Sequence, residues 1–211
     1  MDPDTLIATR SALHAVAEWV LAPARHTHDG RIGLRATPGG FGNDRARVDG
    51  VDLVVGDRRQ PLATLGAAAA FAGVEPGRDT GTYAPETKWD ADASLFVDPE
   101  AARLLADWFA LGTSLLEQLR AETDTPSGIT LWPEHFDVAI DAGPEGHRVN
   151  YGASPGDDDH VWPYLYVGPW SAVERAEPFW NESFGASLGY DDALDHERAL
   201  AFLRRGRQLT D

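Results

Sequence analysis

Two groups of short alternating segments, separated by glycine- and proline-containing turns, restrict the fold of this chain. In the first group, "RIGLRATPGGFG" (31–42) breaks at Pro38-Gly39-Gly40, and "RARVDGVDLVVG" (45–56) contains Asp49-Gly50, a favoured hairpin turn. The second group comprises predicted strands within residues 128–143, 147–153 and 163–170. Connections this short join antiparallel strands, because a parallel pair needs a long crossover. We therefore predict antiparallel sheet.

Helical patterns flank both groups of strands. A first amphipathic helix is predicted to end before Pro23, a short apolar helix to stop at Gly73, and a long helix to begin near Pro99. A last helix is predicted over residues 191–206, with acidic residues at its start and arginines at its end, as the helix dipole favours. The predicted fold class is α+β: an antiparallel sheet packed by helices, with two similar helix-strands-helix halves.

The length of 211 residues suits a single compact domain, 1–211. Its predicted halves are 1–75 and 95–211, joined by a connector at 74–94. Because this connector has no hydrophobic period, we expect a linker or a lid there, with a plain connection as the alternative.

Composition excludes several classes of function. The chain has no cysteine, which rules out disulfides, thiolate metal sites and a cysteine nucleophile. Its net charge of −16 would repel nucleic acid and anionic membranes, so neither is an expected partner. The N-terminal sequence is acidic, and no apolar run approaches the roughly 20 residues of a membrane span. We predict a cytoplasmic protein.

Most of the common catalytic motifs do not occur in the sequence. It contains no G-x-x-x-x-G-K-[ST], G-x-G-x-x-G or H-E-x-x-H motif. The segment "TPGGFG" (37–42) lacks the lysine of a phosphate-binding loop, and a turn at a strand end is the better interpretation.

The segment "LWPEHFDVAI" (131–140) holds the candidate catalytic residues. If it forms one strand, His135 and Asp137 lie on the same face. A carboxylate beside an imidazole can raise its pKa or fix its tautomer, which suits a general base, and the pair can also bind a divalent metal. The alternative is an exposed polar pair.

The loop "GASPGDDDH" (152–160) places three aspartates beside a histidine. Oxygen ligands suit a hard cation, and an imidazole shifts the preference toward zinc, manganese or iron. The candidate metal ligands are His135, Asp137, Asp157 and His160, and a divalent metal is the one cofactor that the sequence suggests. The alternative is a solvated acidic loop.

Aromatic residues are concentrated in the second half of the chain. Strand alternation places Tyr164 and Tyr166 on one face and Leu165 and Val167 on the other, so the tyrosines cannot share an aliphatic core. We predict a partly polar pocket whose candidate ligand-binding residues are Trp132, Asn150, Tyr151, Asp157, Tyr164 and Tyr166.

Four segments, "RIGLRATPGGFG", "LWPEHFDVAI", "VNYGASPGD" and "PYLYVGPW", resemble a family of largely actinobacterial proteins of unknown function. The likeness covers much of the chain between Arg31 and Trp170. It implies a shared fold and a shared site at His135, Asp137, Asn150, Asp157 and Tyr166, and it implies no particular activity.

The sequence supports three hypotheses about function. The first is a small-molecule-binding protein with an aromatic, acidic pocket for a polar or cationic ligand, with acid–base chemistry by His135 and Asp137. The second is a non-enzymatic interaction protein whose acidic surface binds a basic partner. The third is a metal-dependent hydrolase. In the first hypothesis, Asn150 and Tyr166 are predicted to lie on neighbouring strands and on the same face of the sheet.

Overall fold

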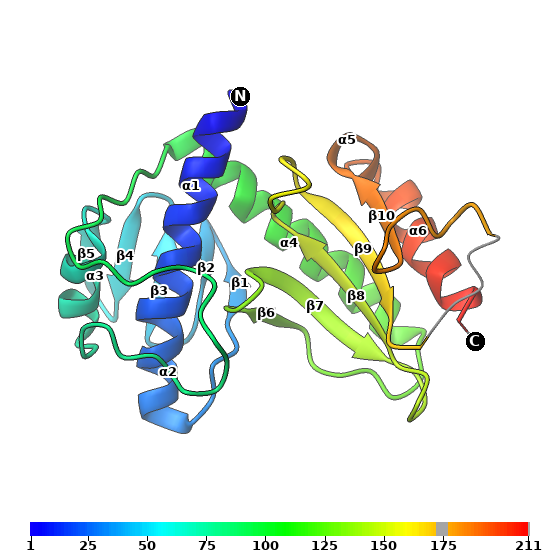
Figure 1. Cartoon of the computed structure of the whole chain (residues 1–211), viewed down its shortest axis with the longest axis horizontal. Helices are drawn as coiled ribbons and strands as arrows, with labels where there is room; N and C mark the ends of the chain where they lie inside the picture. The colour runs from blue at the N-terminus through cyan, green and yellow to red at the C-terminus, as the bar shows by residue number, and fades with distance from the viewer. Residues whose placement is uncertain (172–176, 211) are drawn as a thin grey trace. The chain divides into compact units, whose positions relative to one another are not determined.

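The structure, a computed structural model, describes residues 1–171 and 177–210 (Figure 1). It divides into two compact units: unit 1 comprises Met1–Ala110 with Leu131–Phe136, and unit 2 comprises Leu111–Thr130 with Asp137–Asp211. The boundary at residues 110 and 111 falls inside one helix, and the predicted 74–94 connector lies within unit 1. Among the described residues, no helix has the length and apolar character needed to span a membrane.

Two five-stranded antiparallel sheets give the chain an α+β fold, as predicted. The first sheet has the order β1-β2-β3-β4-β5, so each strand pairs with the next one in the sequence. Its strands are Arg35–Thr37 (β1), Gly40–Gly42 (β2), Ala46–Asp49 (β3), Asp52–Val55 (β4) and Arg58–Pro61 (β5). The predicted hairpin at 45–56 is present, and Gly50 adopts a φ of 62° in its turn.

The second sheet also follows sequence order, as β10-β9-β8-β7-β6. Its strands are Thr130–Trp132 (β6), Asp137–Ala142 (β7), Val149–Ser154 (β8), Tyr164–Pro169 (β9) and Ala186–Gly189 (β10). The sequence patterns did not predict β5 or β10. The chain thus runs helix, five strands, helix, and then repeats that order.

The first helix continues beyond its predicted end. The helix α1 (Pro3–Val16) passes into a π turn, η1 (Ala17–Leu21), and then into α2 (Ala22–Asp29). Ala22 donates its backbone N–H to the carbonyl of Ala17, five residues earlier. The prediction that the helix ends before Pro23 is wrong, because this π turn restarts the helix and leaves the proline in its first turn, where a missing N–H costs little.

The other helices of unit 1 start and stop where their sequences indicate. The Thr64 hydroxyl accepts a hydrogen bond from the Ala67 N–H and caps α3 (Leu65–Ala72), and Gly73 ends this helix with a φ of 71°. Residues 74–94 contain no helix and no strand of the sheets, as expected. The helix α4 (Pro99–Ala121) begins at the predicted proline.

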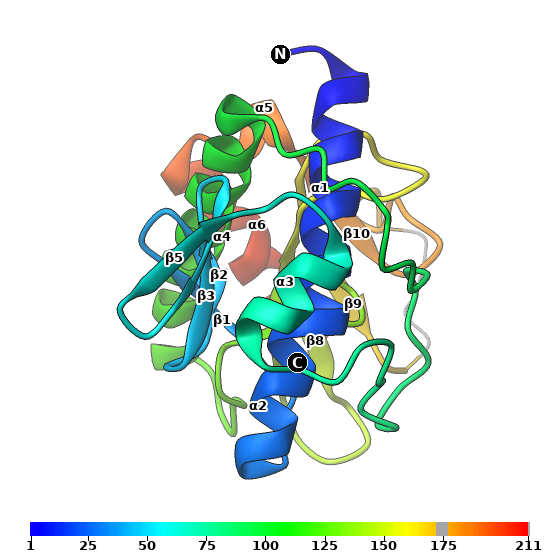
Figure 2. The same cartoon turned by 90° about the vertical axis from the view of Figure 1, so that its left-hand side faces the viewer.

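A cluster of buried aromatic side chains lies in the core of unit 1. Figure 2 shows α1, α3 and the first sheet, which belong to this unit. Phe41 of β2 lies edge-on to Phe109 of α4 and to Phe136, with ring centroids 6.0 and 5.0 Å apart. Phe109 and Phe136 lie 5.3 Å apart. Three segments distant in the sequence are thereby packed against one another.

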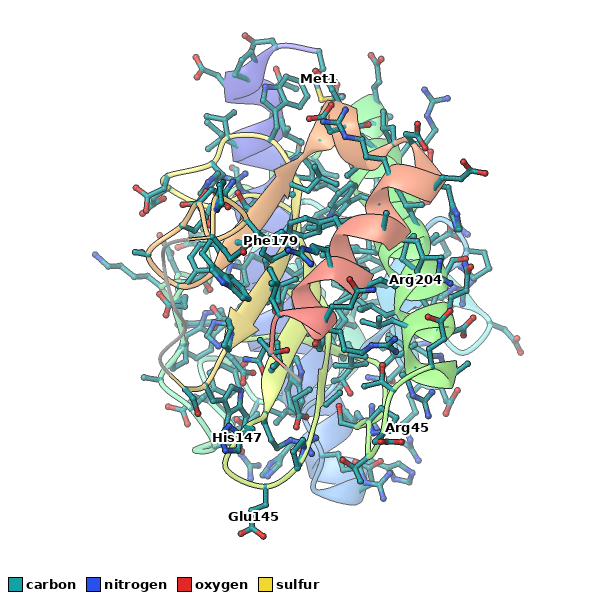
Figure 3. All side chains as sticks on the ribbon, turned by 90° about the vertical axis from the view of Figure 1, so that its right-hand side faces the viewer. Met1, Arg45, Glu145, His147, Phe179 and Arg204 are labelled. Carbon is teal, nitrogen blue, oxygen red and sulfur yellow. The ribbon has the colours of Figure 1, made fainter. Side chains whose placement is uncertain are left out.

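In unit 2, α4 and α6 (His196–Gln208) cover one face of the second sheet, while α5 (Tyr190–Ala193) follows β10. Close approach requires two helix glycines: a Cβ at Gly206 would lie 2.7 Å from Val167, and one at Gly112 would overlap Ala153. Arg204, labelled in Figure 3, joins the two helices through its hydrogen bonds to the carboxylate of Glu122.

Candidate functional site

The second sheet has one aliphatic face and one polar face. Residues paired directly across antiparallel strands share a face. Tyr151 pairs with Val167 and lies on the helix-covered face, whereas Asn150 pairs with Gly168 and Gly152 pairs with Tyr166 on the opposite face. The prediction that Asn150 and Tyr166 share a face of neighbouring strands is confirmed.

The side chain of Tyr166 crosses the polar face from β9 to β7. Its ring lies over Gly152 on β8, where a Cβ would overlap the ring, and its hydroxyl donates a hydrogen bond to Asp137 Oδ2 on β7. The carboxylate of Asp137 belongs to a residue only 4% exposed. Burial, and then the charge of Asp137, raises the pKa of Tyr166 well above its usual value. Tyr166 therefore remains a neutral donor at physiological pH.

Tyr164, two residues before Tyr166 on β9, also donates its hydroxyl to a carboxylate. Its hydroxyl donates to Asp157 Oδ2 at 2.6 Å, and burial together with that carboxylate raises its pKa. The Tyr164 and Tyr166 rings lie 6.3 Å apart, and the ring of Phe184 contacts both. Both tyrosines thus present hydroxyls to carboxylates on the polar side of the sheet.

The loop that carries Asp157 is organised by that residue. Asp157 Oδ1 accepts the backbone N–H groups of Asp159 at 2.9 Å and His160 at 2.7 Å. Burial raises the pKa of Asp157, but the hydrogen bonds from Tyr164 and from these N–H groups lower it by more, so its net shift is downward. The carboxylate is therefore ionised and fixed in position.

His160 lies between two carboxylates. Its Nδ1 is 3.3 Å from Asp157 Oδ1, and its Nε2 is 3.0 Å from Glu182 Oε1, which also accepts the Ser187 hydroxyl at 2.7 Å. Burial lowers the pKa of His160, but the hydrogen bond to Glu182 and the charge of Asp157 outweigh it, and the pKa is raised. The imidazole thus favours its protonated form and can donate from both nitrogens.

A partly exposed aromatic pair includes Trp162 of this loop. Trp162 stacks on Tyr190, the first residue of α5, with ring centroids 5.9 Å apart and an interplanar angle of 27°. Trp162 is 36% exposed, and the neighbouring Asp158, Asp159 and Asp191 are exposed as well. We refer to Asp157, His160, Trp162, Tyr164, Glu182 and Tyr190 as the acidic aromatic edge.

Strands are present within residues 128–143 as predicted, but the hypothesis that residues 131–140 form one strand is wrong. Residues 133–136 form a turn between β6 and β7, with Phe136 at a φ of 53° and buried in the core. His135 is exposed in that turn and belongs to unit 1, whereas Asp137 begins β7 in unit 2. The alternation of a single strand therefore does not relate their side chains, because the chain reverses between them.

The predicted ligand-binding residues fall into different environments. Tyr151 is 1% exposed and belongs to the aliphatic side of the sheet. Trp132 lies on β6 in unit 1. Asn150 is exposed and accepts a hydrogen bond from the indole of Trp170 at 2.8 Å. Of the predicted set, Asp157, Tyr164 and Tyr166 are brought together in unit 2.

The candidate metal ligands are assembled only in part. Asp157 and His160 are neighbours, while Asp137 bonds to Tyr166. Across the described residues, no group of three or more His, Asp or Glu side chains is arranged to hold a metal ion.

The sequence patterns missed a second polar cluster, in unit 1. Glu18 in η1 is 1% exposed, and its carboxylate accepts the N–H of Glu86 at 2.9 Å and the N–H and hydroxyl of Thr87 at 2.7 and 2.5 Å. Burial raises the pKa of Glu18, although the hydrogen bonds from Thr87 partly oppose this. The signal in the sequence is a glutamate surrounded by apolar residues in "AVAEWVL" (15–21).

His14 and the 133–136 turn belong to the same cluster. His14 Nε2 lies 2.9 Å from the carbonyl of Pro133 and 3.9 Å from Glu18 Oε2. Burial lowers the pKa of His14 to about 4, against the smaller opposing effects of Pro133 and Glu86. Because a carbonyl only accepts, Nε2 of the neutral ring carries the proton.

A hollow of about 230 Å³ lies elsewhere in unit 1. Arg25 forms an ion pair with Asp29 at 3.5 Å, and Arg35 with Asp44. These carboxylates offset two of its three arginines, so its lining is close to neutral. The lining residues are Arg25, His28, Asp29, Arg35, Asn43, Asp44 and Arg45.

Comparison with known proteins found no match to the chain among family models, curated proteins or solved structures.

Proposed function

We propose that the protein binds a small cationic organic molecule at the acidic aromatic edge of unit 2. The observation that carries this proposal is the partly exposed Trp162–Tyr190 stack, whose tryptophan lies in the same loop as the fixed carboxylate of Asp157. Aromatic faces and carboxylates both attract a cation, and a ring contributes about 0.5 to 2 kcal/mol depending on desolvation. The surplus of acids, with a net charge of −16, favours the approach of a cation further.

Acid–base chemistry at this edge is assigned to His160, in place of His135 and Asp137, the pair predicted from the sequence. His160 has two carboxylate partners, at 3.3 and 3.0 Å, which support its protonated form. A protonated imidazole can serve as a general acid once a ligand replaces one of these two carboxylate partners. We also propose that the protein belongs to the largely actinobacterial family that its sequence resembles. This proposal rests on the four segments that carry the resemblance.

The experiment is a titration of the full chain with tetramethylammonium chloride, followed through the indole N–H resonances of its seven tryptophans. We expect the Trp162 resonance to shift saturably, with a dissociation constant on the order of millimolar for so small a probe. Trp162→Ala should abolish binding. Trp170→Ala removes another exposed tryptophan of unit 2 and is the matched control. Unchanged binding by Trp162→Ala would contradict the proposal.

The acidic interaction protein remains the alternative, favoured by the exposed Asp158 and Asp159 and by the net charge. Complementary charge makes such association strong at low salt and weak at high salt. In a pull-down, partners that are released between about 0.05 and 0.5 M salt, on the order of a threefold change in Debye length, would favour it. Partners retained at both salt concentrations would count against it.

A further inference from the structure

Three segments of unit 1 contribute polar side chains to a second cluster. None of these side chains belongs to the acidic aromatic edge of unit 2. The segment α1–η1 supplies His14 and Glu18, the 74–94 segment supplies Tyr83, and the 133–136 turn supplies Glu134. The contacts of His14 with Pro133 and of Glu18 with Thr87 hold these segments together. We refer to His14, Glu18, Tyr83 and Glu134 as the Glu18 cluster.

Two buried polar atoms of this cluster have no hydrogen-bond partner among the described residues: the Tyr83 hydroxyl and Glu134 Oε2. Tyr83 and Glu134 lie on segments that contact the same helix, one through the hydrogen bond from Thr87 to Glu18 and the other through that between Pro133 and His14. Leaving such an atom unpaired costs about 1 to 3 kcal/mol, and native proteins leave few of them. Two such atoms on adjoining segments are groups that a bound molecule could satisfy.

The chemistry of the cluster selects the partner. Glu134 Oε2 and the Glu18 carboxylate only accept hydrogen bonds, and the Tyr83 hydroxyl can accept as well as donate. The partner must therefore donate. Because the cluster contains the two carboxylates of Glu18 and Glu134, a positive charge is favoured, and a primary ammonium group combines that charge with three N–H donors.

The surrounding structure suits such a group. The Trp19 and Trp89 rings lie 5.8 Å apart beside the cluster, and the Trp19 indole donates to the Thr87 hydroxyl at 3.0 Å. Aromatic faces favour a cation near them. Glu18 lies in a π turn, a departure from the α-helix that occurs frequently at functional sites.

We propose that the Glu18 cluster binds the primary ammonium group of a small organic molecule, with Glu134 Oε2 and the Tyr83 hydroxyl as direct partners. This site is separate from the one in unit 2 and does not depend on it. The two differ in what they recognise: ring faces accept any cation, whereas the Glu18 cluster requires N–H donors.

The test compares two cations on the full chain, n-propylammonium chloride and tetramethylammonium chloride, and follows the indole N–H resonances of Trp19 and Trp89. We expect saturable shifts with n-propylammonium and none with tetramethylammonium, which has no N–H. Glu134→Gln should weaken binding at least tenfold and Tyr83→Phe at least threefold. Glu100→Gln, which changes an exposed glutamate of unit 1, should bind as wild type.

A second measurement separates binding from a structural role. Tyr83→Phe removes a hydroxyl without a partner, so the Tm of the unliganded variant should be at least that of wild type even as its ammonium binding weakens. Three results would overturn the proposal: no saturation with n-propylammonium, equal shifts with tetramethylammonium, or wild-type affinity in both variants. None of these results bears on Trp162.

Discussion

The ring of Tyr166 occupies the space above Gly152, its cross-strand partner, and this lets a tyrosine on β9 bond to Asp137 on β7. Gly152→Ala should therefore displace the ring and destabilise the protein by about 1 to 3 kcal/mol, the usual cost of overpacking. Chemical denaturation measures this. Gly168→Ala is the control, since a Cβ there would lie 3.9 Å from its nearest neighbours, an ordinary contact. Equal losses in both variants would contradict the explanation.

Removal of the Tyr166 hydroxyl should also reduce stability. Tyr166→Phe deletes a hydrogen bond to the buried carboxylate of Asp137, and bonds to charged groups contribute about 1.5 to 3 kcal/mol. A loss of stability is the expected result because the hydroxyl is buried and hydrogen-bonded. A double-mutant cycle with Asp137→Asn measures the coupling, and additive effects would show that the two side chains do not interact.

The charge of His160 should make stability fall as the pH rises. The folded-state pKa of His160 lies above its usual value of 6.5 because Asp157 and Glu182 face the ring, with Tyr164 packed beside it. The contribution of His160 to the free energy of unfolding is complete below pH 6.5 and is lost as the pH rises through the folded-state pKa. Denaturation of wild type and Glu182→Gln at several pH values tests this, and the variant should lose much of the slope above pH 6.5.

His14 should have the opposite effect, on the acid side. Its pKa of about 4 in the folded protein, against 6.5 when unfolded, corresponds to about 3 kcal/mol of stability. That contribution is complete above pH 6.5 and is lost as the pH falls toward 4, because the unfolded chain binds the proton first. Glu18, Glu86 and His135 are the titratable groups near the ring. His14→Gln should lower the slope between pH 4 and 6.5, whereas the exposed variant His147→Gln should retain it.

Glu18 should anchor the 74–94 segment. Glu18→Gln replaces the carboxylate that accepts two backbone N–H groups and a hydroxyl, and we expect a loss of about 1.5 to 3 kcal/mol. Amide hydrogen exchange at Glu86 and Thr87 should accelerate in the variant. Glu86→Gln, which changes an exposed side chain, should leave both amides protected. Unchanged exchange in Glu18→Gln would show that other contacts hold the segment.

Local patterns predicted those parts of the fold that depend on local chemistry. The alternation in "PYLYVGPW" correctly separated Tyr164 and Tyr166 from Leu165 and Val167, because a strand has a period of two wherever it lies. The stop at Gly73 and the start at Pro99 were likewise predicted from the residues themselves.

The features that the sequence did not reveal depend on distant residues. Phe136 takes a positive φ and ends the predicted strand because its ring packs against Phe41 and Phe109, which no local pattern indicates. Glu18 was missed because its partners, Glu86 and Thr87, lie 68 and 69 residues away. A buried charge is recognisable only once the groups that satisfy it are known.

The π turn at Ala17–Leu21 also bears on how this gene can change. A turn closed by a bond over five residues holds one residue more than an α-turn of the same helix. Deleting a single codon here would let the helix close with ordinary bonds and become more regular. Because the wider turn already accommodates the extra residue, the deletion would leave α1 and α2 in phase and would change only the directions of the side chains within the turn. The shortened protein would then have a more regular helix, in which the Glu18 carboxylate no longer accepts hydrogen bonds from Thr87.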